Sequence, residues 1–191
     1  MYRSILSRFK WLNFALVAIL VTLAQASCSP PETPDYIEVL PRTLNVGDEL
    51  PTLIDNAIIE ISGGTIGETP VNVNISLLEA MGTVKYTVYD PYELREVEYE
   101  GVLLATLFDQ FGGVDADSVA ILAIDDYLQT IPREHTEKWP VLLALKTDGN
   151  YAQRSHRGPA MIIYPYDKYR ELDPTTFDPL WVWQISHMTF N

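Results

Sequence analysis

The sequence Arg157-Gly158-Pro159-Ala160-Met161-Ile162-Ile163-Tyr164-Pro165-Tyr166 contains the clearest buried strand of this chain, and Trp181-Val182-Trp183-Gln184-Ile185 has a similar composition. Ala160 to Tyr164 is apolar and lies between two prolines, which occur at strand ends because proline cannot donate to a central ladder. The run therefore predicts a strand buried on both faces. The aromatic and β-branched residues of Trp181 to Ile185 predict a second strand. A polar surface loop, Asp167 to Pro179, joins the two.

Further strands and a few short helices are predicted around this pair. Thr83 to Tyr89 alternates as a half-buried strand, and Ser76-Leu77-Leu78-Glu79 has the spacing of a capping box that opens a short helix. Leu103 to Phe111 has apolar residues at helical spacing, so its Leu and Phe side chains are expected to pack on the sheet. Further strands are expected at 57–61, 97–99, 118–124, 127–131 and 141–146. The fold class is α+β, with a mixed β-sheet core.

The chain begins with the pattern of a secretory signal peptide. Three basic residues precede an uncharged apolar run, Trp11 to Leu23, which is followed by Ala24-Gln25-Ala26. Residues 1–26 are therefore expected to be a signal peptide that delivers the protein to the periplasm or cell envelope. A transmembrane anchor is the alternative, but the run is shorter than the roughly 20 apolar residues that span a bilayer.

Cys28, the one cysteine of the sequence, leaves two maturation routes open. Cleavage after Ala26 is one, and lipidation of Cys28 is the other. The only membrane contact expected of the mature chain is through such a lipid anchor. A single cysteine also excludes a disulfide within the chain. Residues 27–56 are rich in proline and read as a linker, and the folded domain is expected to occupy 57–191.

The chain of 191 residues is acidic. It has 26 Asp and Glu against 13 Lys and Arg, a formal net charge of −13. Removal of the signal peptide takes away three bases, which leaves 26 acids against 10 bases, or −16. A surface of this sign repels phosphate backbones, so nucleic acid is not an expected partner.

The order of these segments resembles the molybdopterin-binding domain of sulfite-oxidase-like oxidoreductases, in particular small exported single-domain members. The resemblance is carried by Arg157-Gly158-Pro159, the strand, Pro165, the loop and Trp181 to Ile185, and it continues upstream through 99–104, 126–132 and 143–149. It implies the sulfite-oxidase-like fold, and it implies an oxidoreductase that uses molybdopterin.

Two departures from that family concern the cofactor. The family's metal-ligating cysteine is on the loop after the strand that corresponds to Thr83 to Tyr89. Here Tyr89 and Asp90 take that position, and the loop has no cysteine. Leu180 stands where active relatives carry a basic residue for the cofactor's phosphate. Carboxylates and hydroxyls do not readily replace a soft thiolate ligand. The sequence therefore predicts no metal site and no bound molybdopterin.

Three residues remain as a candidate cleft for an anion or a pterin: Arg154, His156 and Arg157. Two arginines that flank a histidine could hold an anion by bidentate hydrogen bonds. The alternative is that they pair with the abundant surface carboxylates. Trp181 and Trp183 would share one strand face, where they are expected in the core, although a stacked flat ligand is the alternative. No zinc-ligand spacing and no serine-nucleophile motif is present, so no catalytic residue is predicted.

Two functions from different classes follow. The preferred one is an exported binding or sensory accessory module that has lost molybdenum chemistry and holds a small anion or a partner protein of the envelope. The alternative is a redox enzyme that binds molybdopterin without the thiolate ligand. The fold cannot distinguish them, because function is determined by the site.

Overall fold

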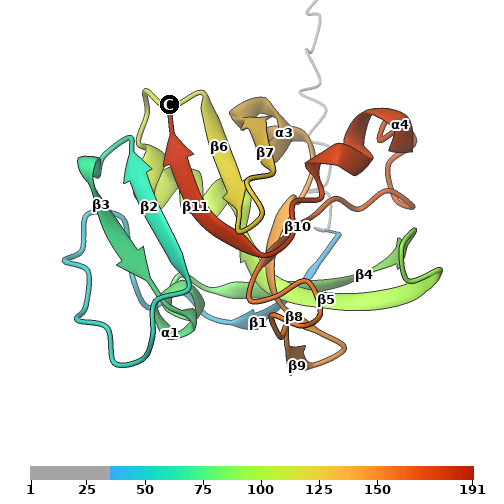
Figure 1. Ribbon diagram of the computed structural model, residues 1–191, viewed down its shortest axis with the longest axis horizontal. Coiled ribbons are helices and arrows are strands. Elements are labelled where there is room, and N and C mark those ends of the chain that lie inside the picture. The colour runs from blue at the N-terminus through green and yellow to red at the C-terminus, as the bar shows by residue number, and fades with distance from the viewer. Residues whose placement is uncertain (1–34) are drawn as a thin grey trace, which may run out of the picture. The chain divides into compact units, whose positions relative to one another are not determined.

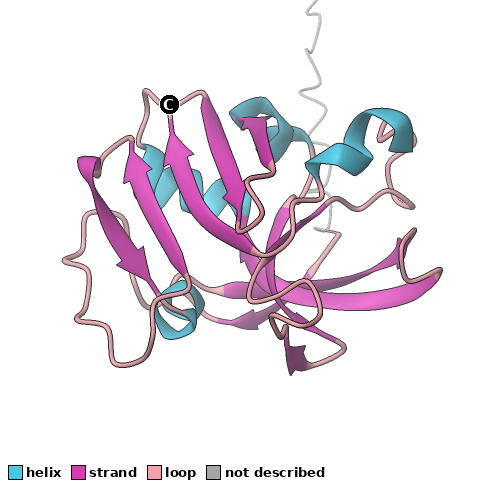
Figure 2. Cartoon of the chain, viewed as in Figure 1, coloured by secondary structure: helices cyan, strands magenta, loops and turns pink. Residues whose placement is uncertain are grey.

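The computed structural model describes residues 35–191, which belong to one compact unit made of two β-sheets and short helical segments (Figures 1 and 2). Within these residues, the larger sheet has the order β1-β4-β5-β8-β10 with β9 beside β8, and the smaller has the order β3-β2-β11-β6-β7. The strands are β1 Ile37–Leu40, β2 Ile59–Gly63, β3 Gly67–Val73, β4 Thr83–Asp90, β5 Arg95–Leu103, β6 Ser118–Ala123, β7 Leu128–Pro132, β8 Leu142–Thr147, β9 Asn150–Tyr151, β10 Met161–Ile163 and β11 Ile185–Phe190.

The helical segments are short and lie between strands. They are α1 Ile75–Ala80, α2 Leu104–Leu107, the π-helical turn η1 Phe108–Gly112, α3 Arg133–Lys138, α4 Pro174–Phe177 and the 3₁₀ turn η2 Asp178–Leu180. The pairings within the larger sheet are antiparallel, whereas β11 pairs parallel to β2 and antiparallel to β6. The predicted α+β class with mixed β-sheet structure and few short helices is therefore confirmed.

Several sequence patterns form the structures they predict. β10 is fully buried, as the apolar run between two prolines indicates. In β4 the predicted face of Val84, Tyr86 and Val88 is buried. The apolar stripe after β5 packs on the smaller sheet, where the rings of Phe108 and Phe190 lie 5.1 Å apart. Alternation and helical spacing are reliable here because each element has one face in the core.

The strand predicted at Trp181 to Ile185 is wrong, because β11 begins only at Ile185. Its first four residues form an irregular connection. Val182 O accepts a hydrogen bond from Ile162 N at 2.9 Å, and Gln184 adopts a left-handed backbone with φ 50°, which interrupts an extended chain. The apolar composition of this segment reflects burial against β10 and does not reflect a ladder.

The helix predicted to start with a capping box at Ser76 is capped instead by Asn74. The Asn74 side chain accepts from Leu77 N at 2.9 Å, so α1 begins at Ile75. Asparagine is as good an N-cap as serine, and the cap that lies closer to the preceding strand determines where the helix starts. Gly82, at φ 88°, follows the helix as expected.

The part of the expected linker that the structure describes belongs to the folded unit. β1 lies at the edge of the larger sheet and pairs antiparallel with β4, and Leu44 is buried in the core. The folded unit therefore begins upstream of Ala57, because the short strand β1, which lies among the prolines, pairs with β4. The predicted signal peptide and Cys28 lie outside the described residues. Within 35–191, no helix is long and apolar enough to cross a membrane.

Candidate functional site

The candidate site begins at the turn between β4 and β5, which Asp90 organises. Asp90 is the last residue of β4, and its Oδ1 accepts from the backbone N–H groups of Tyr92 at 2.7 Å and of Glu93 at 2.9 Å. An aspartate followed by proline favours such a side-chain turn. Leu94 closes the turn with a left-handed backbone, φ 55°. The turn fixes the positions of the Tyr92 and Glu93 side chains.

The Asp90 carboxylate is completely buried and accepts from two more side chains. The Tyr99 hydroxyl and the Arg157 guanidinium both donate to Oδ2, the latter from Nη1 at 2.6 Å. Burial alone would raise the pKa of Asp90, but hydrogen bonds from Tyr99, from two backbone N–H groups and from Arg157 lower that pKa below its ordinary value. Asp90 is therefore an ionised carboxylate, and each of its oxygens already accepts two hydrogen bonds.

Arg157 reaches Asp90 from the loop between β9 and β10, whose backbone is tightly held. Arg157 has a left-handed backbone, φ 62°, and Gly158 follows where a Cβ would lie 2.1 Å from Ala152 O. Gln184 N donates to Arg157 O at 2.9 Å, and Gln184 Nε2 donates to Arg154 O at 2.6 Å. The loop is thus joined to the segment that precedes β11, so both present side chains to one region.

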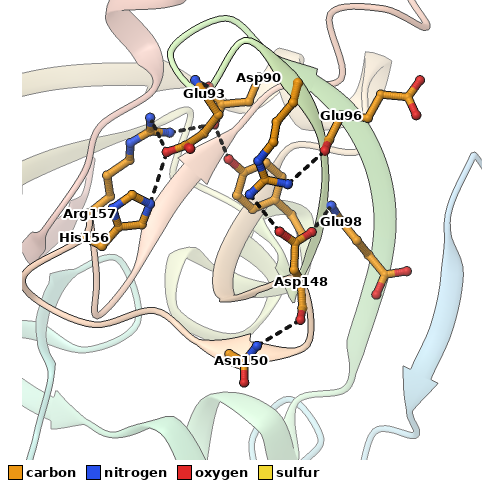
Figure 3. A network of polar contacts seen from close by, with 10 residues as sticks. Asp90, Glu93, Glu96, Glu98, Asp148, Asn150, His156 and Arg157 are labelled. Carbon is orange, nitrogen blue, oxygen red and sulfur yellow. Dashed lines mark hydrogen bonds and ion pairs between the residues drawn. The ribbon is translucent and has the colours of Figure 1, made fainter.

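The Arg157 side chain is only 13% exposed and is surrounded by carboxylates and aromatic rings. It makes a second ion pair with Glu93, from Nη2 at 3.0 Å, beside the one with Asp90 (Figure 3). Its Cζ lies 4.5 Å from the ring centroid of Trp183 and 5.4 Å from that of Tyr92. The guanidinium is therefore neutralised by two acids and stacked on aromatic faces. We call Asp90, Glu93, Tyr99 and Arg157 the ion-pair cluster.

The structure brings some of the sequence-predicted site residues together and leaves others apart. His156 joins the ion-pair cluster through Nε2, which lies 3.1 Å from Glu93 Oε1, but its side chain is 64% exposed (Figure 3). Arg154 is exposed, and its guanidinium makes no ion pair with the residues in 35–191. Tyr89 points away as an exposed residue of β4. Asp90, His156 and Arg157 therefore form one cluster, without Arg154 and Tyr89.

A pocket of about 260 Å³ opens beside the ion-pair cluster. The β4–β5 turn, the β6–β7 turn and the stretch from η2 to β11 converge there. Its walls are aromatic and acidic, and no basic residue of the described range 35–191 lines it. The lining residues are Tyr92, Ala123, Asp125, Tyr127, Asp178, Pro179, Trp181, Trp183 and Gln184. We call it the aromatic pocket.

The aromatic pocket differs from the cluster in how its polar atoms are satisfied. Trp181 is 3% exposed, and its Nε1 and that of Trp183 have no hydrogen-bond partner among residues 35–191. Burial raises the pKa of the neighbouring Tyr166, and the charge of Asp178 raises it further. Buried polar groups without partners, such as these two indole N–H groups, are uncommon in folded proteins.

Sequence reasoning missed several residues of this site. Glu93 and Tyr99 complete the cluster, and Tyr127 and Asp178 line the pocket. The only local signal was the Asp-Pro turn at 90–91, which indicates that Asp90 caps a turn but not which side chains meet there. The remaining partners come from elements far apart in the sequence, so no spacing rule could have joined them.

A molybdenum centre of the kind that the resemblance implies does not fit these residues. The resemblance places its thiolate ligand in the loop that includes Tyr89 and Asp90, and Asp90 is a hard carboxylate whose oxygens are all engaged. Residues 35–191 contain no cysteine, and no group of His, Cys, Asp and Glu within them could hold a metal ion. Leu180 lies in η2 and offers no charge to a phosphate.

Comparison with known proteins supports a distant relation at the level of the fold. No family model and no curated protein matches the sequence. Among solved structures, the chain is similar to the sulfane dehydrogenase SoxCD from Paracoccus pantotrophus, with a TM-score of 0.52 and 16% sequence identity. The match covers 69% of this chain and 37% of that one. The fold is thus distantly like that of a sulfane dehydrogenase, and the chain spans little more than a third of the protein that it matches.

Proposed function

We propose that this protein is a small-molecule-binding accessory module that has no molybdenum chemistry, built on a distantly molybdenum-oxidoreductase-like fold. The observation that carries the proposal is the saturation of Asp90. A fully buried carboxylate with four hydrogen bonds stands where the resemblance places the metal ligand. Coordination of a metal there would require breaking bonds that hold the β4–β5 turn.

The ion-pair cluster is also a poor receptor for a small anion. It contains two carboxylates and one guanidinium, and both terminal nitrogens of Arg157 already contact a carboxylate. An anion would have to displace Asp90 or Glu93 and leave a buried charge unpaired, which is strongly destabilising. The cluster is therefore a structural support, and we place ligand binding in the aromatic pocket that it borders.

Export to the envelope belongs to the same proposal. It is supported by the basic start, the apolar run from Trp11 to Leu23 and Ala24-Gln25-Ala26. Intact-mass measurement of protein recovered from the envelope tests it. A mature chain that starts after Ala26 or carries lipid on Cys28 agrees with export, whereas a chain that retains Met1 contradicts cleavage.

The metal content of the native protein is the main test. We expect protein purified from a host that makes molybdopterin to contain no stoichiometric molybdenum and to release no pterin on denaturation. A molybdopterin enzyme produced in the same cells is the positive control for cofactor supply. The variant Asp90→Cys asks whether a thiolate at this position is sufficient for metal uptake. Stoichiometric molybdenum in the wild type would contradict the proposal and favour the enzyme that binds its cofactor without a thiolate.

A further inference from the structure

We propose that the aromatic pocket binds a small organic cation, with a quaternary ammonium group as the simplest example. This inference rests on the proposed function, because it names the ligand class of the proposed binding module. The pocket lies at three converging turns, and its volume of about 260 Å³ suits a ligand of a few heavy atoms. Its walls have the two properties that select such a cation, which are aromatic faces and negative charge.

Four of the lining side chains are aromatic and come from three separate segments. Tyr92 belongs to the β4–β5 turn, Tyr127 to the β6–β7 turn, and Trp181 and Trp183 to the stretch before β11. The rings of Tyr92 and Trp183 are perpendicular, with centroids 4.7 Å apart, and Trp181 is tilted against Tyr92 at 6.2 Å. The rings of Tyr92 and Trp183 thus pack edge to face against each other, and with Trp181 and Tyr127 they form an aromatic wall of the pocket. Aromatic faces bind quaternary ammonium groups.

Two of these rings already contact a cation of the protein. The Arg157 guanidinium lies over both Trp183 and Tyr92, at 4.5 and 5.4 Å from the centroids. This internal contact is an example of the cation–π interaction that the proposal assigns to the pocket. Arg157 itself does not line the pocket, and its charge is balanced by Asp90 and Glu93. It therefore opposes an incoming cation only weakly.

The charge of the pocket points to the same ligand class. Asp125 and Asp178 line it, and none of the Lys, Arg and His residues that the structure describes does. The whole chain has a formal net charge of −13, so the field around the pocket attracts cations and repels anions. Tyr127 holds the two acidic segments together, because its hydroxyl donates to Pro179 O at 2.9 Å and its N–H donates to Asp125 Oδ1 at 3.2 Å. These hydrogen bonds hold the two acidic segments of the aromatic pocket in place.

Choline is a suitable probe, because an uncharged analogue exists in which a carbon atom replaces the quaternary nitrogen. We expect choline to shift the indole N–H signals of Trp181 and Trp183 saturably in nuclear magnetic resonance spectra of the full chain. The uncharged analogue should bind about fivefold more weakly or worse, which corresponds to one water-screened charge contact. Acetate, as the anion arm, and sodium chloride at matched ionic strength should produce no saturable shift.

Variants with matched controls locate the site. Tyr127→Leu removes one ring and should weaken choline binding about twofold to fivefold, the strength of one exposed cation–π contact. Tyr89→Leu, an equally exposed tyrosine outside the pocket, is its control. Asp125→Asn and Asp178→Asn should each weaken binding about fivefold. Asp126→Asn, next to Asp125 but outside the pocket, should change nothing.

Each outcome decides between the proposals. Preference for choline over its analogue, lost in the pocket variants and kept in the controls, supports the organic-cation site. Equal affinity for both probes, absence of saturable binding, or insensitivity to the pocket variants overturns it. If one of these contradicting results is obtained with molybdenum-free protein, only the organic-cation proposal fails. Stoichiometric molybdenum in the same preparation would instead contradict the binding-module proposal.

Discussion

The ion-pair cluster and the aromatic pocket are neighbours, because Tyr92 and Trp183 line the pocket and also contact Arg157 of the cluster, yet the hydrogen bonding of their polar groups is opposite. In the cluster, Asp90 accepts four hydrogen bonds and Arg157 makes two ion pairs. In the pocket, both indole N–H groups have no hydrogen bond within residues 35–191. The charged groups of the cluster thus have partners, whereas the indole N–H groups beside the pocket have none within residues 35–191.

This difference separates a structural role from a binding role. A buried charge with all its hydrogen bonds made contributes to a unique fold, and removal of one partner is costly because the other is left buried and unpaired. Unsatisfied buried polar atoms cost free energy of folding, and their presence beside a cavity distinguishes the pocket from the cluster. Substitutions in the cluster should therefore reduce stability, whereas substitutions at the exposed wall of the pocket should change affinity.

The largest expected effect is that of Asp90→Ala. It removes the acceptor of four hydrogen bonds and leaves the buried Arg157 and the Tyr99 hydroxyl without it. The free energy of unfolding should fall by about 3–5 kcal/mol, the cost of breaking a buried ion pair. Urea denaturation measures this. Glu96→Ala, an exposed carboxylate on β5, should stay within about 0.5 kcal/mol of the wild type. A loss below about 1 kcal/mol for Asp90→Ala would contradict the structural role of the cluster.

The two tryptophans of the pocket sharpen the comparison. Trp181 is almost fully buried and stacks on Tyr166, with ring centroids 5.2 Å apart, whereas Trp183 is half-buried. Trp181→Ala should cost about 3–5 kcal/mol through lost burial and the cavity left behind. Trp183→Ala should cost clearly less, although the sequence alone places both in the core. Equal losses in the two variants would mean that Trp183 is as much a core residue as Trp181.

Acid should reduce the stability that the ion-pair cluster contributes. Because the pKa of Asp90 is lowered in the folded protein, the unfolded chain takes up this proton first as the pH falls. The stability that Asp90 contributes is therefore complete above about pH 4 and is lost below it, at no more than about 1.4 kcal/mol per pH unit. Urea unfolding at several pH values, compared between wild type and Asp90→Asn, measures this contribution of Asp90 to the free energy of unfolding. A stability difference that does not shrink in acid would contradict it.

The sequence predicts the elements of this fold better than it predicts the site. Strands with one buried face, such as Thr83 to Tyr89, follow from alternation alone. Asp148-Gly149, a dipeptide typical of two-residue hairpins, forms such a turn with φ values of 47° and 77°. Trp181 to Ile185 shows the limit of the method. Apolar composition indicates burial, but whether a buried segment joins a ladder depends on partners such as Ile162, which local sequence does not specify.

The candidate site was only partly predictable for the same reason. Asp90 stood out because a turn-forming aspartate occupies the position of a family ligand, and Arg157 stood out as a basic residue beside Gly158-Pro159. That these two residues, 67 positions apart in the sequence, form an ion pair depends on the packing of the β9–β10 loop against the β4–β5 turn. The sequence likewise gives no sign that Asp178 faces the same pocket as Tyr92.

The smallest expected effect concerns Arg154, which the sequence cannot distinguish from Arg157. Arg157 has two ion pairs, whereas the Arg154 side chain is exposed and has no ion-pair partner in residues 35–191. Arg154→Ala should therefore change the free energy of unfolding by less than about 0.5 kcal/mol. Arg157→Ala should cost about 3 kcal/mol, because it leaves the buried Asp90 unpaired.

Calorimetric titration of the same variants with phosphate and sulfite tests whether these arginines bind an anion. If anions bind and Arg154→Ala abolishes that binding without loss of stability, the anion cleft first expected from Arg154, His156 and Arg157 is supported. The assignment of a structural role to the ion-pair cluster and of ligand binding to the aromatic pocket would then be wrong.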